Sequence, residues 1–383
     1  MAILRLALAF AAFISVGLPD ALLGVSWPFA RDSFGQSLDA AGILVFGATV
    51  GYSLSALAAG RLIPMLGLGG LLTLSTCLTS LGLGIYLLEP NFWVLVTVVT
   101  LAAVGGGSID VGLNHYAMDY HGSAVMQWLH ASFGVGVTIG PALMVLAIAG
   151  PGGWQSGYAW VAAGLAALAL VFALSYRIWP TLADHAQASG AIGPMQALRS
   201  PRVLGAVSMF AIYVGLETAI GIWAFSVMLD RQVSAVQAGV WVSAYWGSFT
   251  ISRILAGMMG DRVSHWMWLR LSLVGAALAS AIWMIGSGWM ATLPVALIGF
   301  AMGPIYPAMM SGTSDRVSAE LKAAAIPLQV GPPILVAGLI VWAFGVVGEG
   351  FGLQWIPWLV FSFLVILLLI ESQLLAAARK SLD

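Results

Sequence analysis

Three acidic residues lie inside long apolar stretches of this chain, where a carboxylate is energetically unfavourable. They are Asp20, Asp110 in the string Gly-Ser-Ile-Asp-Val-Gly-Leu-Asn over 107–114, and Glu217 in the second half. A charged side chain at the centre of a bilayer costs about 2.5–3.5 kcal/mol on insertion scales. A chain tolerates such a group where it faces protein or water, usually because it binds a proton, an ion or a solute.

Proton exchange is the chemistry that these acids suggest. No lysine or arginine lies equally deep in the same stretches, so none of the three has an evident ion-pair partner. Desolvation favours the protonated form of an unpaired carboxyl group, which can then load and release a proton near neutral pH. We therefore predict proton coupling at Asp20, Asp110 and Glu217. A permanently protonated acid with one interhelical hydrogen bond is the alternative for each.

Polar side chains extend the pattern around Asp110. Asn114 follows at i+4 on the same helix face, whereas His115 at i+5 lies about 100° round the helix. Gln127 and His130 occupy the next apolar stretch, after a short polar link that makes the two helices antiparallel neighbours. We predict solute contacts at Asn114, Gln127 and His130, with a proton relay or a hydrogen-bonded structural role as alternatives for the histidine.

Tryptophan is frequent, with 16 in 383 residues. Most tryptophans of a membrane protein are expected near helix ends, where they anchor the chain at the interface. Trp223 and Trp246 are less easily placed there. Because aromatic faces stack on sugar rings, we predict solute contacts at both, with packing as the alternative.

The composition limits the protein class. The chain is 61% hydrophobic and 8% charged, whereas soluble proteins carry about 25% charged residues; it is therefore an integral membrane protein. A net charge of −1 argues against a nucleic-acid partner. The single cysteine, Cys77, excludes an internal disulfide and is expected to be a small packing residue. His115 and His130 form too small a ligand set for a metal, so no metal or cofactor is expected.

Twelve stretches are long enough for a transmembrane helix, which needs about 20 apolar residues. The first is interpreted as a retained helix, because its apolar character continues past Asp20, further than a secretory signal requires. The expected helices cover 3–28, 39–60, 68–88, 91–117, 123–149, 155–178, 202–229, 235–258, 267–287, 290–311, 321–346 and 353–376.

Loop charges predict the orientation. With a cytoplasmic N-terminus, twelve of the 14 basic residues fall on the cytoplasmic side, and only Arg31 and Arg231 lie outside. The longest polar stretch separates the sixth and seventh helices. We expect a six-helix bundle over 1–178, a cytoplasmic linker over 179–200 and a second bundle over 201–383. The expected location is the cell inner (plasma) membrane, with both termini cytoplasmic and a monomeric chain.

The two halves resemble each other weakly, because Asp20 aligns with Glu217 at the same offset that aligns Gly60 with Gly257. Two six-helix halves of this kind resemble the major facilitator superfamily. The resemblance implies an all-α membrane protein of two pseudo-symmetric bundles, with a midplane solute site. The string over 253–262 also resembles the loop motif of this superfamily, which implies a cytoplasmic gate formed by Arg253, Asp261 and Arg262.

A closer resemblance is to the fucose permease family. It rests on the string over 107–114, on Asp20-Ala-Leu-Leu and on Leu-His-Ala-Ser-Phe-Gly over 129–134. The family's members are proton-coupled sugar symporters. The resemblance implies that Asp110 is the proton or sugar carboxylate, Asp20 the second coupling acid and Asn114 a sugar contact.

We therefore expect alternating-access symport of a sugar or sugar-like solute with protons. The main alternative is a proton-coupled exporter of drugs or amphiphilic, lipid-like compounds, because Gly140-Pro141 resembles the exporter motif of the same superfamily. A membrane receptor would need a signalling domain, and the loops are short. An enzyme is not expected, because no catalytic set at suitable spacing stands out. Gly136 and Gly331 are expected to permit close helix contacts or kinks.

Overall fold

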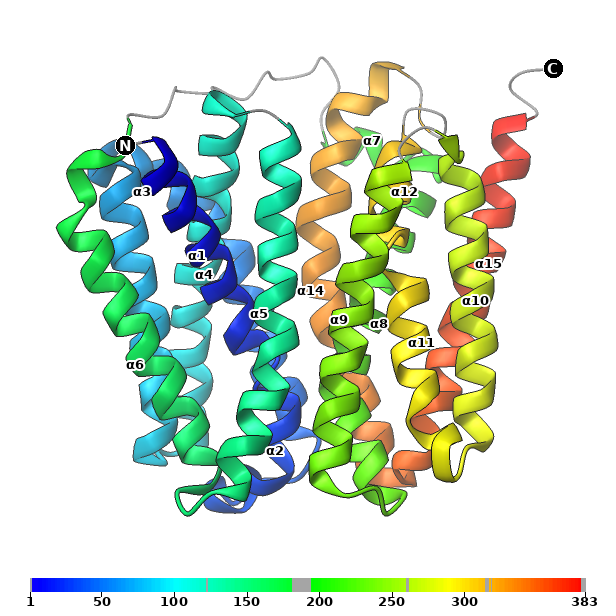
Figure 1. Cartoon of the computed structure of the whole chain (residues 1–383). Coiled ribbons are helices and arrows are strands. Elements are labelled where there is room, and N and C mark those ends of the chain that lie inside the picture. Colours follow the sequence, from blue (N-terminus) through cyan, green and yellow to red (C-terminus); the bar gives the residue numbers. More distant parts are fainter. Residues whose placement is uncertain are drawn as a thin grey trace. The chain divides into compact units, whose positions relative to one another are not determined.

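The computed structural model describes residues 2–121, 123–180, 194–259, 262–313, 317 and 319–379. Within these ranges the chain is helical, with short turns and no strands (Figure 1). It divides into two compact units, 1–185 with 235–243 and 186–234 with 244–383. Part of the linker predicted over 179–200 lies outside the described residues.

The first unit contains five long helices among its described residues, the short helix α2 and their connections. Its strongest helix contacts are between α3 and α4, between α1 and α5, and between α3 and α6. The elements are α1 (Ala2–Asp20), α2 (Leu23–Ala30), η1 (Arg31–Phe34), α3 (Ala40–Gly84), η2 (Ile85–Leu88), α4 (Phe92–Tyr120), α5 (Ser123–Ala149), α6 (Gly153–Leu174) and η3 (Tyr176–Ile178).

The second unit is built mainly around α8 and α14, which make its most extensive contact. Helix α9 begins in the segment assigned to the first unit and continues into the second. The elements are α7 (Pro194–Ala197), α8 (Pro201–Asp230), α9 (Ala235–Met259), α10 (His265–Ile285), η5 (Gly288–Ala291), α11 (Leu293–Met302), α12 (Ile305–Ser311), α14 (Ala319–Phe351), η6 (Leu353–Trp355) and α15 (Ile356–Arg379).

Ten segments among the described residues are long and apolar enough to cross a membrane. The shorter apolar segment Ala40–Ser55 and the 25-residue helix α9 lie where the second and eighth helices were expected, but neither is among these ten. The second and third expected helices are assigned as one element, α3, because helical geometry resumes directly after Gly67. That residue is non-helical, with φ of 66°, a conformation that glycine adopts without steric cost.

Two expected helices are broken rather than continuous. The first ends at Asp20 and resumes at Leu23, so the expectation of one helix over 3–28 was wrong. The tenth is divided at Gly303-Pro304 into α11 and α12, so the continuous helix over 290–311 was also wrong. Proline removes a backbone donor and its ring clashes with the preceding turn, and Pro19 and Pro304 stand at these two breaks.

Glycines hold α1 and α5 in close contact. A β-carbon on Gly136 would lie 2.3 Å from the carbonyl oxygen of Ile14, and one on Gly17 would lie 2.3 Å from that of Phe133. Neither position can hold a larger residue unless the helices separate. Gly331 differs from the expectation, because a β-carbon there would meet no atom within 4 Å.

The two arginines expected on the outer side both bind nearby groups. Arg31 lies 3.8 Å from the carboxylate of Asp32. Arg231 donates to the carbonyl oxygen of Trp283 at 2.6 Å, near the end of α10. A cation at a helix C-terminus stabilises the helix, so Arg231 has a structural role.

Candidate functional site

Asp110 on α4 forms the centre of a polar cluster in the first unit. The hydroxyl of Tyr52 on α3 donates to Oδ2 of Asp110 at 2.6 Å, and Nδ2 of Asn114 donates to Oδ1 at 3.0 Å. The three side chains are half-buried. Both partners of the carboxylate are neutral. The shared helix face predicted for Asp110 and Asn114 is thus present, whereas Tyr52 was not predicted.

Asn114 has an unused acceptor. Its Oδ1 atom is buried and has no hydrogen-bond partner among the described residues. A buried acceptor without a partner costs about 1–3 kcal/mol, so a donor from water or a solute hydroxyl would stabilise it. The cluster therefore presents a carboxylate already held by two donors beside an amide oxygen that can accept one more.

Asp20 is the last residue of α1, at the break before α2. Its side chain is exposed on the first unit, and no hydrogen bond or ion pair to it is found among the described residues. Broken transmembrane helices place polar groups and unpaired backbone atoms at membrane depth where they line a cavity. The proton-coupling role of Asp20 stays a prediction.

The other polar residues predicted near Asp110 have varied surroundings. His130 on α5 is exposed and meets the ring of Phe13 edge-on, with 5.3 Å between the ring centroids. His115 is half-buried. Gln127 belongs to α5, but its side chain lies outside the described residues. Among the part of the chain that the structure covers, no group of three metal-binding side chains occurs.

Glu217 on α8 is half-buried in the second unit. The hydroxyl of Tyr245 donates to its backbone carbonyl at 3.0 Å. The Tyr213 hydroxyl lies within reach of its carboxyl group, and the charge of Arg253 acts on it. The expectation that no cation lies near this acid was therefore wrong.

Arg253, one of the predicted gate residues, belongs to α9, in agreement with the helix expected over 235–258. Its side chain is half-buried. Its guanidinium lies 4.4 Å from the ring centroid of Phe249 and donates through Nε to the carbonyl of Gly303 at 3.1 Å. Arg262 is exposed, and Asp261 lies outside the described residues. The gate role of Asp261 and Arg262 therefore stays a prediction.

The two predicted tryptophans are buried packing residues. Trp223 is 1% exposed, and its Nε1 donates to the carbonyl of Val341 at 3.0 Å, so it joins α8 to α14 and has no face open to a solute. Trp246 is 7% exposed and packs on Gly221, where a β-carbon would lie 2.6 Å from the indole. Its Nε1 is buried, and no described residue accepts a hydrogen bond from it.

A fourth membrane acid was not identified in the sequence. Glu371 on α15 is 0% exposed and pairs with Arg270 of α10, which donates to its Oε2. This acid forms an ion pair with Arg270, and because the pair joins α10 to α15 it indicates a structural role. Cys77 also differs from the expectation, because it is exposed on α3 rather than packed in the core.

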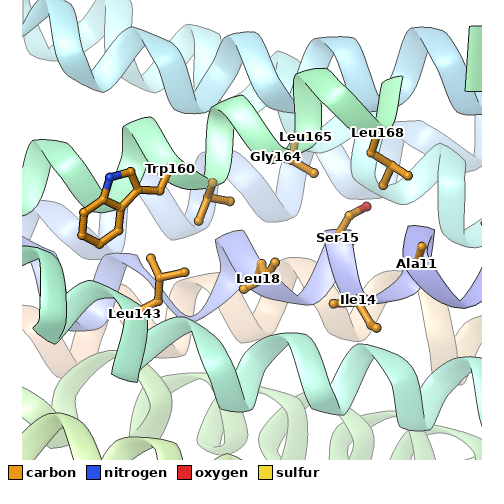
Figure 2. A pocket seen from close by; sticks show the side chains of 10 residues that line it. Ala11, Ile14, Ser15, Leu18, Leu143, Trp160, Gly164, Leu165 and Leu168 are labelled. Atoms are coloured by element: carbon orange, nitrogen blue, oxygen red, sulfur yellow. The ribbon is translucent and has the colours of Figure 1, made fainter. Parts of the chain in front are cut away.

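An apolar groove of about 250 Å³ lies between α1, α5 and α6. Figure 2 shows Leu143 of α5, Trp160 of α6 and Ser15 of α1 around it. The Ser15 hydroxyl already donates to the carbonyl of Ala12 at 2.7 Å. The groove contains none of the predicted site residues. Its lining is Ala11, Ile14, Ser15, Leu18, Leu143, Trp160, Val161, Gly164, Leu165 and Leu168.

Comparisons with known proteins identify the family. The family model described as Major Facilitator Superfamily matches residues 8–329. The Glucose/mannose transporter GlcP of Bacillus subtilis (strain 168) is 23% identical over 276 residues, covering 69% of this chain and 68% of the relative. The Sodium-dependent glucose transporter 1A of Mus musculus is 27% identical over 143 residues, which cover 36% of this chain and 33% of that protein.

Solved structures share the fold at low identity. The nucleoside transporter NupG (D323A mutant) has a TM-score of 0.77 at 12% identity, covering 97% of this chain and 99% of that one. A bacterial homologue of the human lysosomal transporter Spinster, in an inward-facing and occupied conformation, has a TM-score of 0.75 at 14% identity, covering 98% and 96%. With the helical fold and the membrane-embedded acids, these matches establish that the chain belongs to the Major Facilitator Superfamily of membrane transporters.

Proposed function

We propose that the chain is a proton-coupled symporter of a sugar or a sugar-like solute, with Asp20, Asp110 and Glu217 as the protonatable groups. The observation that carries the proposal is the cluster of Tyr52, Asp110 and Asn114 in the first unit. It combines a carboxylate with neutral partners and a buried amide oxygen that lacks a donor.

Sugars suit such a cluster because every hydroxyl both donates and accepts hydrogen bonds. A solute hydroxyl can donate to Oδ1 of Asn114, and a second hydroxyl can share the carboxylate of Asp110. The names of the Bacillus subtilis and mouse relatives, which state glucose or mannose transport, support this solute class.

Protonation of Asp110 would change the cluster in a defined way. The ionised carboxylate accepts two hydrogen bonds, but a protonated carboxyl group carries a donor on one oxygen. Either the Tyr52 hydroxyl must then turn, or the Asn114 amide must rotate and exchange its nitrogen for its oxygen. The second change alters the group that a solute meets, so proton binding and solute binding become linked.

The direct test is solute-induced proton movement in proteoliposomes that hold the purified protein. Monosaccharides, sugar acids, nucleosides and amphiphiles are each added outside, without an imposed gradient. A sugar that enters together with protons makes the external medium more alkaline. The result that would refute symport is sugar uptake without any pH change. A parallel arm with and without sodium separates proton from sodium coupling, because the mouse relative is named as sodium-dependent.

Export of amphiphiles in exchange for protons is the second candidate. The groove between α1, α5 and α6 favours it, because its volume and apolar lining suit a hydrocarbon chain. Under this alternative the amphiphile arm produces proton movement opposite to that of symport, and no sugar produces any.

A further inference from the structure

The break between α11 and α12 is held by side chains from two other helices. The hydroxyl of Tyr213 donates to the carbonyl of Met302 at 3.1 Å, and Nε of Arg253 donates to the carbonyl of Gly303 at 3.1 Å. In a regular helix the carbonyl of Gly303 would accept from the residue four positions later. That residue is Pro307, which has no N–H group. Arg253 therefore replaces a missing backbone donor.

The break also lies directly against α9. A β-carbon on Gly303 would lie 2.1 Å from Oγ of Ser252 and 2.4 Å from the carbonyl oxygen of Phe249. Tyr213 and Met302 are both 0% exposed. Water cannot easily substitute for the two side-chain donors in so close a contact, so loss of either leaves a carbonyl unpaired.

Glu217 is coupled to both donors. It lies four residues after Tyr213 on α8, its carboxyl group is within reach of that hydroxyl, and the charge of Arg253 acts on it. A hydroxyl has one proton. Tyr213 can donate it to the carbonyl of Met302 or to the carboxylate of Glu217, but not fully to both.

Few other titratable groups lie near this carboxyl group among the described residues. Tyr245 faces Glu217 from α9 but donates to its backbone carbonyl, a bond that does not depend on the charge of the carboxyl group. From α12, Tyr306 lies beside Tyr213, with 6.3 Å between ring centroids. The acids described on the neighbouring α14 and α15 are Glu349, two residues before the end of α14, and Glu371, which is paired with Arg270.

We propose that Tyr213 and Arg253 are positioning residues through which the proton on Glu217 sets the geometry of the α11–α12 break. When Glu217 is protonated, its carboxyl group donates to the Tyr213 oxygen, and both side-chain donors serve the carbonyls of Met302 and Gly303. When Glu217 is charged, the Tyr213 hydroxyl and the Arg253 guanidinium are attracted to its carboxylate. The carbonyls of Met302 and Gly303 then lose their side-chain hydrogen bonds. The inference rests on the proposed function only in taking Glu217 as a group that exchanges protons.

Hydrogen–deuterium exchange of the full chain in lipid nanodiscs tests this without solute or gradient. The readout is the protection of peptides covering 293–313, with labelling times scaled for the intrinsic effect of pH. We expect protection in the wild type to fall by about fivefold as the pH rises, the equivalent of about one hydrogen bond. Glu217→Gln, which can still donate to Tyr213, should keep high protection at every pH.

Tyr213→Phe and Tyr245→Phe form a matched pair of buried tyrosines. Tyr213→Phe should lower protection and flatten its pH dependence, whereas Tyr245→Phe should keep the wild-type dependence. The proposal is overturned if Glu217→Gln retains the wild-type pH response, or if the two tyrosine variants behave alike. Because the readout uses no solute, a failure of sugar symport and a failure of this switch give separate results.

Discussion

The two units surround their membrane acids differently. In the first, Asp110 accepts hydrogen bonds from two neutral groups, Tyr52 and Asn114. In the second, Glu217 lies within the field of a cation, Arg253, that also holds the helix break. Under the two proposals made above, a proton on the first acid changes a solute site from negative to neutral, whereas a proton on the second frees Arg253 to hold the helix break. The contrast in their partners is the reason for linking Asp110 to the solute and Glu217 to helix geometry.

Replacement of Asp110 should have the largest effect. Asp110→Asn removes the titrating group but keeps the size of the side chain, so we expect proton-driven accumulation to fall to a ratio of about one, because coupling is lost. Exchange of internal for external solute should continue. Both are measured with radiolabelled solute in proteoliposomes. Asp32→Asn, an exposed acid of the same unit, is the control and should accumulate solute normally.

Asn114→Ala should weaken solute binding by about tenfold, because it removes the unused acceptor and one donor to Asp110. The measurement is the solute Kd by calorimetry on purified protein. An unchanged Kd would place the solute elsewhere and remove the distinction between the two acid clusters. Trp223→Phe should leave Kd unchanged if its ring only packs against α14.

Helix packing in the first unit offers a third test. Gly136→Ala places a β-carbon against the backbone of α1 and should destabilise the protein by about 1–3 kcal/mol, the usual range for overpacking. Gly164→Ala on α6 is the matched control, because a β-carbon there meets no atom within 4 Å. Thermal unfolding in detergent compares the two. Equal stability would mean that α1 and α5 are not in close contact.

Tyr52→Phe should have the smallest effect. The change removes one neutral donor to the Asp110 carboxylate, so we expect the solute Kd to weaken by about threefold, less than for Asn114→Ala. Calorimetry on purified protein measures it. An unchanged Kd would show that the hydrogen bond from Tyr52 does not help to position this carboxylate for the solute.

The sequence predicted the parts of this arrangement that depend on local spacing. The i, i+4 relation of Asp110 and Asn114 follows from the helical repeat, and it is confirmed by their hydrogen bond. Most membrane-spanning segments were also predicted, because hydropathy and length indicate them, and the superfamily suggested by the two similar halves is confirmed by the family match.

Contacts between distant parts of the chain could not be predicted in this way. Tyr52 precedes Asp110 by 58 residues, and no local pattern relates them. Arg253 was assigned to a cytoplasmic gate because of its motif and its charge, whereas its side chain donates to the carbonyl of Gly303, 50 residues further along the chain. The helix breaks were missed because hydropathy does not register backbone geometry, although Pro19 and Pro304 were visible signals.

The number of protons taken up when solute binds tests the central claim most directly. Calorimetry of solute binding in buffers of different ionisation enthalpy counts these protons, in the wild type and in Asp110→Asn. The account predicts proton uptake on binding in the wild type and clearly less in the variant, with measurable solute binding in both. Equal proton uptake in the two proteins, or none in the wild type, would contradict it.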